Sequence, residues 1–189
     1  MRAARLCGVL MAMLLPVSAI AQTAAVESVQ VDPAKVYGSM IRTAERAAVG
    51  LAEAMPEDKY SFVPSADFFH DGKGTEFKNV RTFAQQIAHI ASSNYEYLQA
   101  MGLEKDKDFA AVEKLTTKAE VLQALKDSFA AAEKAAAAIT AQNVFEGLGP
   151  KKATTRAGLA SAIAWHTMDH YGQLVIYARM NGVVPPQSR

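Results

Sequence analysis

Two histidines four residues apart, His166 and His170, are the residues of this chain best suited to chemistry. An α-helix has 3.6 residues per turn, so side chains at this spacing project from the same face. Burying two imidazole rings side by side is costly unless their nitrogens find partners. A divalent metal ion would satisfy both rings at once, and we interpret the pair as two metal ligands. The pair lies within an apolar stripe that reads Leu159, Ile163, His166, His170, Leu174 and Tyr177.

A third histidine, His89, lies in an earlier segment with helical periodicity. At 100° per residue it points roughly 120° from the centre of that segment's apolar face, on a flank shared with Gln86, Ser93 and Tyr97. If this flank meets the helix of the histidine pair, the metal lies in a cleft at one side of the fold. If it does not, His89 is a surface histidine. The sequence leaves this rotation open.

The residue types available as ligands limit which metal ions this chain could bind. The only cysteine, Cys7, lies in an N-terminal segment that we expect to be removed, so the ligands would be nitrogen or oxygen atoms. If His89 joins the pair, three neutral imidazoles leave a position for water or substrate, as in catalytic zinc sites. Such an ion could lower the pKa of water or of a substrate thiol, or polarise a carbonyl. Zinc suits these ligands best, while nickel, iron, cobalt and manganese stay open.

Four other residues near these histidines or in the loops have less specific roles. Asp169 either accepts a hydrogen bond from an imidazole or is a solvated surface carboxylate. His70, in a long loop, either approaches the metal or carries protons, or is simply exposed. We interpret Trp165 and Tyr171 as packing residues rather than catalytic ones. The sequence shows no Ser-His-Asp order, phosphate-binding glycine loop or paired carboxylates.

Four amphipathic helices are expected to position these side chains, near residues 33–55, 82–101, 117–141 and 155–181. Their starts are marked by Asp32-Pro33, by the capping boxes Thr82–Gln85 and Thr117–Glu120, and by Thr154 or Thr155. Gly102 and Asn181-Gly182 mark helix ends. The apolar faces carry Tyr37, Met40, Ile41, Ala44, Ala48, Leu51 and Met55 in the first helix, Phe83, Ile87, Ile90, Asn94, Leu98 and Met101 in the second, and Leu122, Leu125, Phe129, Ala132, Ala136 and Ile139 in the third.

Helices of roughly 20 residues with shared apolar faces predict an all-α four-helix bundle. No strand-like alternation of useful length and no internal repeat is present. The connection from Pro56 to Arg81 is long for a bundle. It is either a functional loop or a crossover between distant helices, and we favour the crossover.

The first residues resemble a cleavable signal peptide. Arg2 and Arg5 precede the apolar stretch 6–15, and Ala19-Ile20-Ala21 is a typical cleavage site, so the mature chain should begin at Gln22. Ten apolar residues are too few to span a bilayer, which needs about 20; a retained anchor is the alternative. We therefore expect a signal peptide at 1–21, a single domain at 22–189 with its core about 33–186, and a periplasmic or secreted location.

The net charge of the chain limits the classes of macromolecule that it could bind. Without residues 1–21, which contain two arginines, Lys+Arg falls from 20 to 18 against 19 Asp+Glu, a net charge of −1. A near-neutral chain without a basic cluster is not expected to bind nucleic acid. After signal cleavage we also expect no membrane association.

Three blocks of the sequence resemble the DinB-like (DinB/YfiT) superfamily. Residues 80–91 (VRTFAQQIAHIA) resemble its second-helix motif, residues 165–173 (WHTMDHYGQ) its fourth-helix motif, and residues 179–186 (RMNGVVPP) its usual ending. The resemblance covers roughly residues 33–186. It implies an up-down-down-up four-helix bundle, often a homodimer. It also implies a divalent metal held by one histidine from the second helix and two from the fourth, which match His89, His166 and His170.

The superfamily includes thiol-dependent S-transferases and a thiol-dependent isomerase, and many members have no known reaction. Low-molecular-weight thiols are mainly cytoplasmic, so an exported member would be poorly supplied for that reaction. We expect an exported metal-dependent transferase or hydrolase that acts on a small molecule at the three-histidine site. The alternatives are a non-catalytic metal-binding protein, linked to stress or metal handling, and an interaction scaffold whose histidines serve packing.

Overall fold

The computed structural model describes residues 30–68, 71 and 76–188. The expected signal peptide, its cleavage before Gln22, and His70 lie outside the described residues. Along the chain the elements are α1 (Pro33–Ala54), η1 (Glu57–Lys59), η2 (Ala66–Phe68), α2 (Phe83–Ala100), α3 (Phe109–Val112), α4 (Lys118–Ala137), β1 (Gly147–Leu148), β2 (Thr154–Thr155), α5 (Arg156–Met180) and η3 (Pro186–Ser188). The prediction of a mostly helical protein is confirmed.

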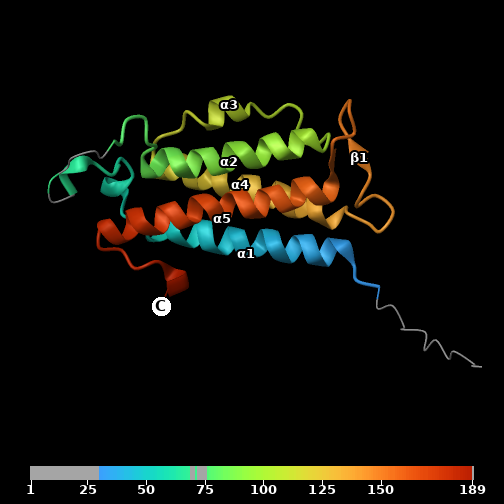
Figure 1. Cartoon of the computed structure of the whole chain (residues 1–189), viewed down its shortest axis with the longest axis horizontal. Helices are drawn as coiled ribbons and strands as arrows, with labels where there is room; N and C mark the ends of the chain where they lie inside the picture. The colour runs from blue at the N-terminus through green and yellow to red at the C-terminus, as the bar shows by residue number, and fades with distance from the viewer. Residues whose placement is uncertain (1–29, 69–70, 72–75, 189) are drawn as a thin grey trace, which may run out of the picture. The chain divides into compact units, whose positions relative to one another are not determined.

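Helices α1, α2, α4 and α5 form the bundle (Figure 1). Helices α1 and α5 run in one direction and α2 and α4 in the other, which is an up-down-down-up order. Each of α1 and α2 packs against both α4 and α5, so α1 and α2 lie diagonally opposite each other. The connection between α1 and α2 therefore links distant helices, as the crossover interpretation predicts.

The connection between α2 and α4 also has to cover a long distance. Because these helices run in the same direction, the chain must return along the bundle before α4 can begin, and the short helix α3 forms on this return (Figure 1). Helix α3 packs against α2. Ser92 of α2 donates a hydrogen bond to the backbone carbonyl of Phe109 at 2.9 Å, which holds the start of α3 on this helix. Helix α3 was not among the four predicted helices.

The helix starts follow the capping signals. Asp32 caps α1, and Thr82 and Gln85 form a reciprocal capping box at α2, because each side chain accepts from the other's backbone N–H. At α4 only half of the predicted box forms. The Thr117 hydroxyl accepts from the backbone N–H of Glu120, but the Glu120 carboxylate accepts from the Thr117 hydroxyl instead of the Thr117 backbone.

Helix α4 ends at Ala137, four residues before the predicted end at 141. The side chain of Asn143 is the reason, because its amide donates to the carbonyl of Ala138 at 3.0 Å and its oxygen accepts from the backbone of Thr140. These bonds close a turn after the helix. Strands β1 and β2, two residues each, then pair antiparallel and bring the chain to α5. These two short strands were not predicted.

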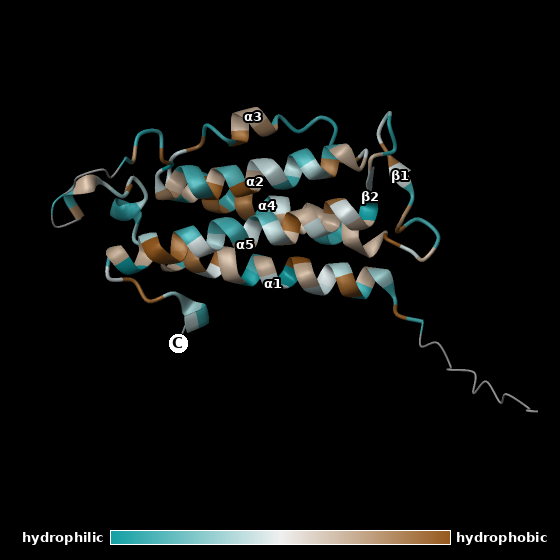
Figure 2. Cartoon of the chain, in the orientation of Figure 1, coloured by the Kyte–Doolittle hydropathy of each residue, from teal (hydrophilic) through white to brown (hydrophobic). Residues whose placement is uncertain are grey.

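The apolar faces pack into one core, and Figure 2 shows apolar and polar residues alternating along the long helices. Every predicted position of α2 is buried, including Asn94, which donates to Ser128 of α4. Two interpretations are wrong. Met40 is 40% exposed and Trp165 is 60% exposed, since both line an open groove rather than the buried core. Within the described residues, none of the helices is both long and apolar enough to cross a membrane.

Candidate metal centre

The structure brings His89, His166 and His170 together. One ligand nitrogen from each ring can be chosen so that all three lie within 4.8 Å of one another. The ring centroids of His166 and His170 are 4.6 Å apart, and that of His89 lies 5.2 and 4.9 Å from them. The open question about the rotation of α2 is thereby settled, because the flank that carries His89 faces α5.

Gln86 determines the orientation of the His170 ring. Its side-chain oxygen lies 2.6 Å from His170 Nδ1, in a buried contact between α2 and α5. Its side-chain nitrogen donates to Gln173 Oε1 at 2.9 Å, and Gln173 donates in turn to the Asp169 carboxylate at 3.4 Å. A carboxylate can only accept hydrogen bonds, so every bond in this series must point toward Asp169. His170 Nδ1 is therefore the donor at the far end of the series. The lone pair of a neutral His170 is therefore on Nε2.

Glu113 plays the corresponding role for His89. One carboxylate oxygen, Oε1, lies 3.0 Å from His89 Nδ1 and 3.3 Å from the Arg81 guanidinium. Burial alone would raise the pKa of Glu113, but the hydrogen bonds from His89 and Arg81 outweigh it and lower that pKa. The carboxylate is therefore ionised near neutral pH and accepts from Nδ1–H, so the lone pair of a neutral His89 is also on Nε2.

The Nδ1 atom of His166, unlike those of His89 and His170, is buried without a hydrogen-bond partner among the described residues. Its Nε2 lies 3.2 Å from Nε2 of His170. Two nitrogens bound to one tetrahedral zinc ion at about 2.05 Å lie roughly 3.3 Å apart, so this spacing fits two ligands of one ion. The donor set also fits, since neutral imidazoles are common ligands of zinc and other transition metals.

Electrostatics keep the two α5 histidines neutral. Burial, followed by the nearby His166 and His89, lowers the pKa of His170 to about 4. Burial is also the main reason that the pKa of His166 is lowered, with His89 adding to it. Asp169 opposes both shifts but does not cancel them. Metal ions bind the neutral ring, so both ligands are available at neutral pH without losing a proton.

The remaining candidates are placed as follows. Asp169 is exposed and its hydrogen bond goes to Gln173, so it reaches His170 only through two glutamines. Tyr171 packs against the core, as predicted, whereas Trp165 does not. Gln86 and Glu113 were not predicted as hydrogen-bond partners of the histidines. The position of Gln86, one turn before His89, was a usable signal for the first; Glu113 lies in a segment without any motif.

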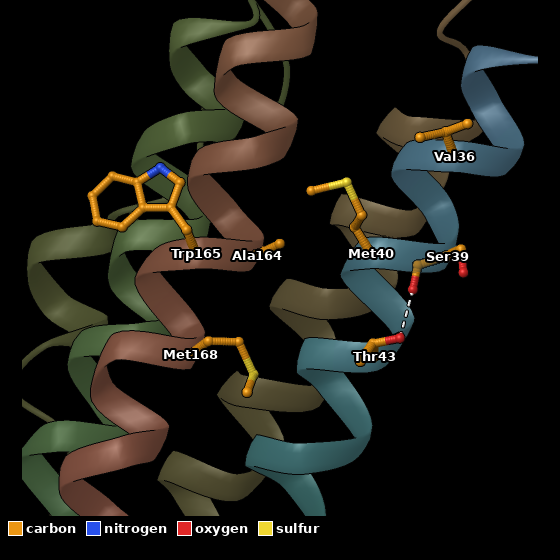
Figure 3. A pocket seen from close by; sticks show the side chains of 7 residues that line it. All are labelled: Val36, Ser39, Met40, Thr43, Ala164, Trp165 and Met168. Carbon is orange, nitrogen blue, oxygen red and sulfur yellow. Dashed lines mark hydrogen bonds between the residues drawn. The ribbon is translucent and has the colours of Figure 1, made fainter.

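A separate open groove lies between α1 and α5, with a volume of about 580 Å³ (Figure 3). Apolar side chains dominate its lining, which comprises Val36, Ser39, Met40, Thr43, Ala164, Trp165 and Met168. The side chains of Met40 and Met168 extend into the space between the two helices. None of the three histidines lines this groove. It is therefore a candidate contact surface rather than part of the metal centre.

Comparison with known proteins identifies the family of this chain. No curated protein matches the chain. A sequence profile of the DinB superfamily matches residues 40–174, which include α2, α4 and all three histidines. The match covers more than half of the 189 residues. The chain therefore belongs to the DinB superfamily.

Proposed function

We propose that His89, His166 and His170 bind one divalent metal ion through their Nε2 atoms. The observation that supports this proposal is that the Nδ1 atoms of His89 and His170 contact Glu113 and Gln86, which puts the lone pairs of both rings on Nε2, and that His170 Nε2 lies 3.2 Å from Nε2 of His166. Zinc is the first choice for three imidazoles, and nickel, iron, cobalt and manganese are the other candidates.

We further propose that this centre serves a transferase or hydrolase that acts on a small molecule. Three protein ligands leave a position for substrate or water. When bound, the ion supplies a Lewis acid that polarises a carbonyl or acidifies water or a thiol. In the protein, Gln86 and Glu113 hold the ligand rings in place.

The alternative is a metal-binding protein without a reaction, linked to stress or metal handling. One observation favours it. Glu113 already accepts from both His89 and Arg81, so it is not free to act as a general base, and Asp169 is exposed and contacts Gln173 instead of a histidine. A metal-loaded protein that turns over nothing in a broad panel of hydrolysis and thiol-conjugation assays would select this alternative.

Export and self-association complete the proposal. The proposed export, to the periplasm or out of the cell, is based on the sequence of residues 1–21. The mass of protein recovered from the periplasm should correspond to a chain that starts at Gln22. The homodimer expected for the superfamily would use the apolar groove between α1 and α5.

Elemental analysis of the purified protein tests the metal centre. The wild type should contain about one divalent ion per chain, and alanine at His89, His166 or His170 should reduce this content strongly. His70→Ala is the matched control and should keep the full content. Full metal content in both His166→Ala and His170→Ala would exclude the site.

A further inference from the structure

The three histidines differ in what holds their Nδ1 atoms. That of His170 meets a neutral amide, Gln86, and that of His166 meets no partner among the described residues. Only the Nδ1 of His89 meets a carboxylate, Glu113. A hydrogen bond to an ionised acceptor is roughly twice as strong as one to a neutral acceptor. The hydrogen bond of His89 to Glu113 is therefore stronger than that of His170 to Gln86.

Glu113 reaches the site from a distant part of the chain. It is the residue that ends α3, on the connection between α2 and α4, and it lies 24 positions from His89 in the sequence. Its placement therefore depends on how α3 packs against α2. The hydrogen bond from Ser92 to the backbone of Phe109 fixes the other end of α3 on the same helix.

A second group orients the carboxylate. Arg81 donates to the same Oε1 atom that His89 contacts, at 3.3 Å. The backbone of Arg81 is itself fixed, because the Tyr177 hydroxyl of α5 donates to its carbonyl at 3.0 Å. Glu113 is thus held on two sides although its side chain is 44% exposed, while the His89 side chain is only 21% exposed. A held carboxylate aimed at a ring nitrogen selects one tautomer of that ring.

We propose that Glu113 is a positioning residue, which holds the proton of His89 on Nδ1 and thereby presents Nε2 as the strongest nitrogen donor of the metal centre. The inference rests on the proposed metal site, but the selection of the tautomer does not need a metal. Removing such a carboxylate partner from a ligating histidine typically weakens metal binding 10- to 100-fold.

The first measurement is made on metal-free protein. Nitrogen-15 NMR at pH 8 reports which nitrogen of His89 carries the proton. The wild type and Glu113→Gln, which keeps an acceptor oxygen, should show the Nδ1–H tautomer. Glu113→Ala should show a mixture or the other tautomer. An unchanged Nδ1–H tautomer in Glu113→Ala would overturn the inference, whether or not the protein binds metal.

The second measurement is the zinc affinity, from competition with a chromophoric chelator. Glu113→Ala should lose about 10- to 100-fold, and Glu113→Gln less. Glu146→Ala is the matched control, since Glu146 is also an exposed partner of an arginine, Arg156 at 3.3 Å, and should change nothing.

A double-mutant cycle separates positioning from a general loss of structure or charge. In a His89→Ala background, Glu113→Ala should cause no further loss of zinc affinity. An equal loss in both backgrounds would overturn the positioning role. A wild type that binds no zinc would refute the proposed metal site, while the tautomer of metal-free Glu113→Ala would still decide whether Glu113 positions His89.

Discussion

Gln86 and His170 lie 84 residues apart in the sequence, yet the Gln86 oxygen is 2.6 Å from His170 Nδ1. The contact joins α2 to α5 at the histidine cluster and is buried from solvent. It fixes both the ring and its tautomer, because the other end of the Gln86 amide is occupied by Gln173. The proposed metal centre therefore lies at a hydrogen bond that joins these two helices.

Replacing Gln86 with leucine should destabilise the metal-free protein by about 1–3 kcal/mol. The buried N–H of His170 would lose its acceptor, and a buried donor without a partner is costly. Chemical denaturation with chelator present measures the change. Gln123→Leu is the control, because Gln123 is exposed and its side chain donates to exposed Asp127, and its effect should stay within about 0.5 kcal/mol. Equal effects of the two substitutions would contradict the structural role of this contact.

Chelation should lower the melting temperature of the wild type. A metal ion that ties α2 to α5 binds only the folded chain, and at 100 times its dissociation constant it adds about 2.7 kcal/mol of stability. For a domain of this size that corresponds to roughly 5–10 °C. Calorimetry with and without chelator provides the measurement. His166→Ala should show no such difference; a chelator effect of wild-type size in this variant would place the ion elsewhere.

The metal-free protein should lose stability as the pH falls from about 6.5 to about 4. An unfolded histidine takes up its proton near pH 6.5. Burial and the neighbouring histidines lower the pKa of folded His170 to about 4, so between these values only the unfolded state is protonated at this residue. Above about pH 6.5 the titration of His170 does not reduce the free energy of unfolding. Below that pH the reduction from this group is on the order of 3 kcal/mol at most.

Denaturation curves across this pH range, recorded with chelator, measure the effect. His170→Gln has no titrating group at this position and should show a smaller slope between pH 6.5 and 4. An identical slope in the wild type and this variant would show that other groups cause the loss. Metal affinity should also fall on acidification, and the lowered pKa values of His166 and His170 place their part of that fall below pH 6.5.

The capping box of α2 should contribute about 1 kcal/mol of stability through Thr82. Its hydroxyl accepts from the backbone of Gln85, and alanine cannot replace that bond. Thr82→Ser retains the oxygen and serves as the control in the same denaturation assay. Thr117→Ala should cost a similar amount at α4. A Thr82→Ala protein as stable as the serine variant would show that the cap contributes nothing.

The apolar groove should be the contact surface if the protein is a homodimer. Met168 lies in the groove and is 41% exposed, so Met168→Glu would place a charge in an apolar interface and should yield monomers. Sedimentation or light scattering of the wild type and variant measures the assembly. Phe145→Glu is the control, because Phe145 is 76% exposed and lies outside the groove. A dimer that survives Met168→Glu unchanged would exclude this surface.

The sequence by itself determined the local parts of this protein. Helical periodicity and caps such as Thr82 indicated where the four long helices begin, because these signals act within one or two turns. The same locality placed His166 and His170 on one face, since residues four apart must share a face of a helix. The ends of α4 and the course of the α2–α4 connection were less predictable, because turns such as that of Asn143 depend on side-chain bonds without periodicity.

Only the tertiary structure decided which faces meet. The rotation of α2 that brings His89 to α5 follows from burying nearly every side of α2 at once, and no single helix contains that information. The contact of Glu113 with His89 depends further on the return of the chain along α2 through α3. Local spacing fixes which side chains share a face, whereas the packing of the whole bundle fixes which faces touch. The histidine pair could therefore be predicted from its spacing, and the contact of Glu113 with His89 could not.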